Sequence, residues 1–129
     1  MKIHHIAIWT TQLEELKNFY CTYFNGISNQ KYVNPVKGFE SYFISFDDGA
    51  SLELMRRADI NSRIGDDRLG YCHLAFSLTS KESVLKLTEQ LRKDGHLVAS
   101  EPRVTGDGYF ESVVLDIDGN RVELVFEGS

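Results

Sequence analysis

The sequence lacks any apolar run long enough to cross a membrane, and it lacks a cluster of basic residues. Its formal net charge of -5 at pH 7 argues against a nucleic-acid partner, because phosphate binding requires a basic face. The first residues have no positive flank followed by an apolar core and a cleavage site, so we expect no signal peptide there. These absences predict a cytoplasmic protein with neither a nucleic-acid nor a membrane partner.

Cysteine is also scarce, since the sequence contains only Cys21 and Cys72. Two distant cysteines exclude both a disulfide framework and a CxxC metal site, and we expect both thiols to be reduced and buried. The chain of 129 residues, with 42% hydrophobic and 26% charged residues, has the composition of one ordinary globular domain.

The sequence contains an internal repeat. Aligning His5 with His73 also aligns two Thr-x-x-Glu motifs, which begin at Thr11 and Thr79. This motif is typical of a helix N-terminus, because the Thr side chain accepts a backbone N–H and the Glu reaches back. Each motif opens an amphipathic stretch that stops near a glycine. The pattern predicts helices over 11–25 and 80–94.

The repeat continues beyond the helices. Both halves contain the triplet Phe-Glu-Ser, then an apolar run, an Asp-Gly turn at Asp48-Gly49 or Asp118-Gly119, and a last run containing Glu-Leu. Asp-Gly between such runs is a strong hairpin signal. The expected strands are 2–9, 28–34, 39–47, 50–57, 70–78, 97–104, 109–116 and 120–127.

These elements predict an α+β fold in which two tandem βαβββ modules form one cupped, partly closed mixed sheet. A helix is expected on the outside of each module. Module one covers 1–57, a polar linker 58–69, and module two 70–129. Neither module is long enough to form a stable hydrophobic core by itself, so we expect one domain over 1–129.

Alternation along the strands places certain polar residues on one face. Side chains of a strand point alternately to opposite faces, so His5 and His73 lie opposite the apolar residues that should pack on each helix. Glu53 and Glu123 are placed in the same way on the last strand of each module. In a cupped sheet the two histidines and two glutamates converge.

Such a cluster requires compensation, because two buried carboxylates repel each other and cost several kcal/mol each. Imidazole nitrogens and carboxylate oxygens suit a divalent ion of Zn, Ni, Mn, Co or Fe, and four protein ligands leave two octahedral positions open. The alternative is two ordinary core histidines and two solvated glutamates at strand ends. The matched placement in two copies favours the metal site.

The sequence resembles the vicinal oxygen chelate (VOC) superfamily over nearly its whole length. The resemblance rests on HIAIWTTQLEELKNFYCTYFNG, LEL, CHLAFSL and DIDGNRVEL. This superfamily includes glyoxalase I, fosfomycin-resistance enzymes, methylmalonyl-CoA epimerase, extradiol dioxygenases and bleomycin-resistance proteins. The residues that occupy the four metal-ligand positions of bacterial glyoxalase I are His5, Glu53, His73 and Glu123.

The resemblance implies a glyoxalase-I-like lyase or isomerase that acts on a small oxygenated substrate through a metal-stabilised enediolate. Glu123 would be the catalytic base, and Glu53 would alternate with it or remain a ligand. The implied cofactor is one divalent metal ion per site, Zn or Ni first, with Mn, Co or Fe as alternatives. The superfamily commonly forms homodimers, and the sequence leaves open whether one chain or two supply a site.

The substrate positions depart from glyoxalase I. That family places an arginine four residues after the first histidine, where this chain has Trp9. Four residues after Glu53, where asparagine is usual, stands Arg57. Trp9 could shape an apolar substrate and Arg57 could hold an anion, although Arg57 could also simply end a strand in solvent. Glutathione is therefore not the expected thiol.

Two further functions are compatible with the residues. One is an Fe(II) extradiol-type dioxygenase, which shares the fold but uses a triad of two histidines and a glutamate. The other is a non-catalytic protein that sequesters an antibiotic or toxin, although bleomycin-binding members generally lack the metal ligands. The complete set of four ligands favours the lyase.

Overall fold

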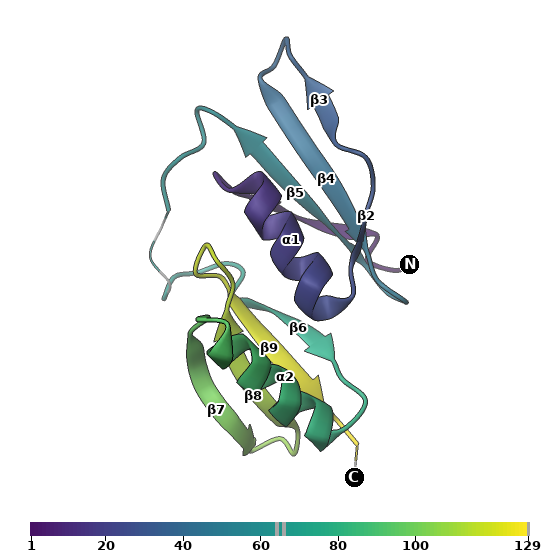
Figure 1. Ribbon diagram of the computed structural model, residues 1–129, viewed down its shortest axis with the longest axis vertical. Helices are drawn as coiled ribbons and strands as arrows, with labels where there is room; N and C mark the ends of the chain where they lie inside the picture. Colours follow the sequence, from purple (N-terminus) through teal and green to yellow (C-terminus); the bar gives the residue numbers. More distant parts are fainter. Residues whose placement is uncertain (64, 66, 129) are drawn as a thin grey trace. The chain divides into compact units, whose positions relative to one another are not determined.

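The structure is a computed structural model that describes residues 1–63, 65 and 67–128. The chain divides into two compact units, residues 1–64 and 65–129, each with one helix and one sheet (Figure 1). The first unit contains β1 (His5–Trp9), α1 (Leu13–Phe24), β2 (Ile27–Ser28), β3 (Tyr32–Asn34), β4 (Phe39–Ser45) and β5 (Ser51–Arg57). The second contains β6 (His73–Ser77), α2 (Lys81–Lys93), β7 (Val98–Val104), β8 (Phe110–Leu115) and β9 (Arg121–Phe126).

The predicted α+β fold with two βαβββ modules is confirmed. The strands form two mixed sheets, one in each unit, where we expected one cupped sheet: a five-stranded sheet with the order β1-β5-β4-β2, in which β3 also pairs with β4, and a four-stranded sheet with the order β6-β9-β8-β7. The strand expected over 28–34 is divided into β2 and β3, because Asn29 between them bonds to Phe43 through both its backbone and its side chain.

The segment between the modules was predicted as a linker over 58–69. It follows β5 and precedes β6, and its positions 64 and 66 lie outside the described residues. The following strand begins at His73, three residues later than expected. Cys72 therefore precedes the strand and is exposed, and Cys21 is half-buried, so the expectation of two buried thiols was wrong. Within the described part of the chain, no helix is long and apolar enough to cross a membrane.

Each module brings its first and last strands together in parallel. β1 pairs with β5 so that Ala7 lies opposite Glu53, and β6 pairs with β9 so that Ala75 lies opposite Glu123. The two ladders thus have the same register relative to the glutamates. This register places a histidine and a glutamate on the same face of each sheet.

The opposite face of each sheet carries the core. α1 packs on β4 and β5, and α2 packs on β7, β8 and β9 (Figure 1). Along β5, Leu52 and Leu54 are buried on the helix side and Glu53 points away from it, as period-two alternation requires. The fully buried apolar side chains are Leu16, Tyr20, Ile44, Leu54, Val84, Leu91, Val114, Val122 and Leu124.

The helix starts differ from the predicted Thr-x-x-Glu capping boxes. α1 follows Gln12, whose side chain makes no cap, and the Gln12 N–H donates to Oγ1 of Thr10 at 2.9 Å. α2 follows Ser80, which forms a reciprocal capping box with Ser83. The hydroxyl groups of Ser80 and Ser83 each accept the other residue's backbone N–H, so the box lies one residue later than the expected box of Thr79 and Glu82.

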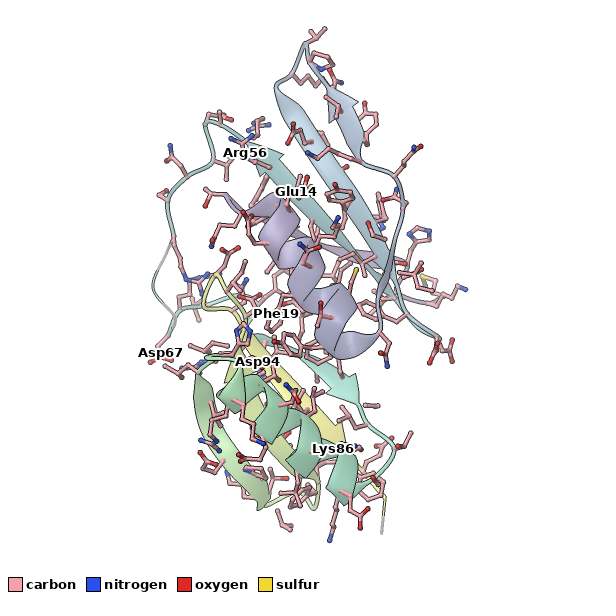
Figure 2. The ribbon with its side chains drawn as sticks, in the orientation of Figure 1. Glu14, Phe19, Arg56, Asp67, Lys86 and Asp94 are labelled. Atoms are coloured by element: carbon pink, nitrogen blue, oxygen red, sulfur yellow. The ribbon has the colours of Figure 1, made fainter. Side chains whose placement is uncertain are left out.

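Glu14 lies on α1 (Figure 2) and bonds to the sheet through Tyr42, on β4. The Tyr42 hydroxyl donates to its carboxylate at 2.9 Å, and Nζ of Lys31 lies 2.7 Å from it. The Lys31 ammonium and the Tyr42 hydroxyl hold the pKa of Glu14 below its ordinary value. A carboxyl group whose pKa is lowered in the folded state stabilises the fold above its unfolded-state pKa and loses that contribution as the pH falls through the folded-state pKa.

We therefore expect Glu14→Gln to lower the free energy of unfolding at pH 7 by less than about 1 kcal/mol, because the side chain is 47% exposed and screened by solvent. The difference from wild type should shrink as the pH falls from 5 toward 2. Urea unfolding across this range measures it, with Glu15→Gln on the same helix as the control. Equal stability of Glu14→Gln and wild type at pH 7 would contradict this interpretation.

Candidate metal centre

The first candidate pair lies on the face of the first sheet that points away from α1. Nε2 of His5, on β1, is 3.6 Å from Oε1 of Glu53, on β5. The Phe43 ring, from β4, makes an edge contact with the imidazole at 5.3 Å between ring centroids. The glutamate side chain is only 18% exposed, so its carboxylate is held in a largely covered position beside the histidine.

The second pair repeats this arrangement in the other unit. Nε2 of His73, on β6, is 3.2 Å from Oε1 of Glu123, on β9, and the glutamate side chain is 19% exposed. The structure therefore brings the four predicted ligands together as two pairs, each within one unit. Among residues 1–63, 65 and 67–128, no group of three or more His, Cys, Asp or Glu side chains is arranged to hold a metal ion.

His4 is a neighbour of the first pair that sequence reasoning missed. Its Nδ1 lies 2.8 Å from Nδ1 of His5, and the two rings meet edge to face. The strand was expected over 2–9, which includes His4, but β1 begins at His5 and His4 is exposed. A histidine that binds metal through one nitrogen usually bonds a fixed partner through the other. His4 can give His5 that partner and leave Nε2 facing Glu53.

Glu111, on β8, is the second missed residue. It lies opposite Val125 and so shares a face with Glu123, two positions along the neighbouring strand. Burial and the nearby Glu123 carboxylate raise the pKa of Glu111 above its ordinary value. The second unit therefore places an additional carboxyl group beside the predicted catalytic base.

The repeated Phe-Glu-Ser triplet explains why the sheet face of Glu111 was not predicted. It aligns Glu111 with Glu40, but on the ladder Ser41 lies opposite Met55 just as Glu111 lies opposite Val125. The two triplets are thus one residue out of step, and a shift of one residue reverses the face of a strand side chain. Glu40 accordingly lies on the other face, near Lys31 and Arg56.

The predicted substrate residues Trp9 and Arg57 lie together at the end of the same face as His5. The Arg57 guanidinium lies over the Trp9 ring at 5.2 Å from its centroid. Nε of Arg57 also bonds to Oδ1 of Asp59 at 2.6 Å. Arg57 therefore does more than end a strand in solvent: its charge contacts an aromatic face and a carboxylate.

The residues present fit a divalent metal ion. Each pair offers one imidazole nitrogen and one carboxylate oxygen, the donor types that Zn and Ni accept, and the two atoms lie within 3.6 Å of each other. The contact between His4 and His5 provides the outer support that such ligands need. Each pair thus supplies two donor atoms of the kind that a divalent ion accepts.

Solved structures share this fold at low sequence identity. Glyoxalase I of Leishmania major, described as trypanothione-dependent, aligns with a TM-score of 0.79 and 22% identity over 98% of this chain and 87% of its own. A glyoxalase family protein of Enterococcus faecalis aligns with a TM-score of 0.78 and 25% identity over 96% of both chains. Glyoxalase I of Zea mays aligns with a TM-score of 0.81 and 20% identity over 99% of this chain.

The chain spans only 45% of the length of the Zea mays enzyme. No curated protein matches it in sequence. The family model of the Glyoxalase/Bleomycin resistance protein/Dioxygenase superfamily matches residues 2–124, nearly the whole chain, as the resemblance in sequence implied. With the two βαβββ modules and the repeated pair of histidine and glutamate, this match shows that the chain belongs to the Glyoxalase/Bleomycin resistance protein/Dioxygenase superfamily.

Proposed function

We propose that the protein is a metal-dependent, glyoxalase-I-like lyase or isomerase that moves a proton between adjacent carbons of a small oxygenated substrate. The observation that carries this proposal is the histidine–glutamate pair that occurs in both units on the face opposite the helix. The glyoxalase I fold of the similar structures supports it. The cytoplasm, where thiol cosubstrates are abundant, is the proposed compartment.

The four residues proposed to hold one divalent ion, Zn or Ni first, are His5, Glu53, His73 and Glu123. When bound, the ion would supply a Lewis acid that polarises two neighbouring oxygens of the substrate. The two units together form one domain in this proposal. A homodimer then allows the two pairs of a site to come from one chain or from two.

The protein residues have distinct roles in the proposed reaction. Glu123 takes the proton from one carbon and returns it to the next, and its carboxylate lies largely covered beside His73. Glu53 remains a metal ligand or alternates with Glu123. Trp9 and Arg57 bind the part of the substrate that does not react. Glutathione is not the proposed thiol, because Trp9 replaces the arginine expected for it.

The first test of this function is metal binding. Titration of the metal-free protein with Zn²⁺ or Ni²⁺ should show one site per pair of units, and His5→Ala or His73→Ala should weaken it at least about 100-fold. His4→Ala should weaken it by about 10-fold, because His5 loses its fixed partner. His96→Ala, outside both pairs, is the control. Binding that neither His5→Ala nor His73→Ala changes would contradict the four-ligand site.

The second test is activity with the metal-loaded protein. Methylglyoxal mixed with a panel of thiols should be converted with at least one thiol other than glutathione, and a chelator should abolish turnover. Oxygen uptake with catechols after anaerobic loading with iron would support a dioxygenase instead. Tight binding of small molecules that a chelator does not affect, with no turnover, would support a sequestering protein.

A further inference from the structure

A cluster of aromatic and charged side chains lies on the metal-site face of the first sheet. We call it the Trp9 platform, and its members are Trp9, Phe39, Arg57 and Asp59. The Phe39 ring meets the Trp9 ring nearly at a right angle, 86°, with 6.1 Å between centroids. Arg57 lies directly opposite Phe39 on the neighbouring strand, and its guanidinium lies over the indole.

The platform lies at a fixed distance from the proposed metal ligands. Arg57 follows Glu53 by four residues on β5, and Trp9 follows His5 by four residues on β1. Strand geometry makes that separation about 13 Å, at ~3.3 Å per residue. The platform can therefore contact only the distal end of a substrate whose reacting oxygens lie beside Glu53.

The charge of Arg57 is already compensated within the platform. Asp59 bonds to Nε of the guanidinium, and this contact lowers the pKa of Asp59, so the carboxyl group is ionised at neutral pH. The platform thus carries one positive and one negative charge. An incoming carboxylate would be repelled by Asp59, and it would have to share or replace a contact that is already made.

The shape of the platform favours a flat group. A guanidinium lies on an indole face as a planar stack, and planar groups continue such stacks by dispersion and offset contacts. The Trp9 side chain remains 40% exposed, which leaves indole surface for a ligand. Phe39 contributes an apolar wall beside it, since its ring stands almost perpendicular to the indole.

We propose that the Trp9 platform selects substrates whose distal end is planar and uncharged, and that Asp59 is the residue that rejects anionic ends. This inference rests on the proposed function for the identity of the reacting end, but recognition at the platform is measurable without any reaction. It revises the expectation that Arg57 would bind an anionic group of the substrate, because Arg57 is already paired with the Asp59 carboxylate.

Binding at the platform can be measured by intrinsic tryptophan fluorescence, because Trp9 is the single tryptophan of the sequence. Quenching of its fluorescence should be titrated with phenylacetamide and phenylacetate, which match in shape and differ in charge. The wild type should bind the amide about fivefold more tightly, and Asp59→Asn should tighten phenylacetate binding by about fivefold while leaving the amide unchanged. Asp67→Asn is a matched control, since it removes an exposed carboxylate beside Arg121 in the other unit.

Three results would overturn the inference. The first is that the wild type binds phenylacetate at least as tightly as phenylacetamide. The second is that Asp59→Asn weakens phenylacetate binding, which would show that Asp59 positions Arg57 to bind anions. The third is that neither probe changes the Trp9 fluorescence at saturating concentration. None of these measurements requires metal or turnover, so the lyase proposal and this inference can fail separately.

Discussion

Glu123→Gln is expected to lower the turnover of the metal-loaded protein by about 100-fold or more, the range for loss of a general base. Glutamine has the shape of glutamate and keeps one oxygen that can face a metal, but its amide does not accept a proton at neutral pH. The substitution therefore removes the proposed proton transfer and preserves the packing on β9. Initial rates at matched metal occupancy measure the loss.

Two comparisons distinguish lost chemistry from lost metal. Metal content should be measured on the same samples, because a variant that no longer binds metal would also be inactive. Glu127→Gln, an exposed carboxylate just after β9, is the control and should keep wild-type turnover. Full turnover of Glu123→Gln with metal bound would refute the role of Glu123 as the base and leave it at most a ligand.

Leu124→Ala and Leu54→Ala should each lower the free energy of unfolding by about 2–5 kcal/mol. Both side chains are 0% exposed, and each leaves a cavity between the sheet and the helix of its unit. They are equivalent positions, since each follows a glutamate of the candidate site. Leu85→Ala, partly exposed on α2, is the control and should change stability by less than about 1 kcal/mol.

The same pair of variants tests whether the two units form one domain. In a single cooperative domain, either substitution lowers one shared melting transition, measured by calorimetry. In two independent units, each substitution lowers one transition and leaves the other unchanged. That second result would contradict the proposed single domain over 1–129.

Period-two alternation explains why the sheet faces could be predicted. Leu52, Glu53 and Leu54 alternate between core and open face, and a shift in strand boundaries does not alter that alternation. The helix starts were less predictable. Thr79 and Ser80 are adjacent candidates for the N-cap of α2. The capping box that forms pairs Ser80 with Ser83, three residues later.

The repeat likewise predicted both histidine–glutamate pairs but missed their neighbours. Glu111 depends on the pairing of β8 with β9, which is one residue out of step with the repeated triplet. Asp59 depends on the path of the chain after β5, and no periodic pattern extends there. Residues on the strand pairing that both units share were predictable from the repeat. Residues whose position depends on a single turn, or on a strand register found in one unit alone, were not.

The parallel pairing of first and last strands has a consequence for the order of folding. His5 lies in β1, the first strand of its module, and Glu53 lies in β5, the last. The pair therefore forms only when the chain between these two strands has closed into a loop. Such non-local contacts form slowly, because the entropy of loop closure is lost before any contact compensates it. A metal ion held as proposed would therefore find no paired ligands in a partly folded chain. It should slow unfolding of the finished protein without accelerating its folding.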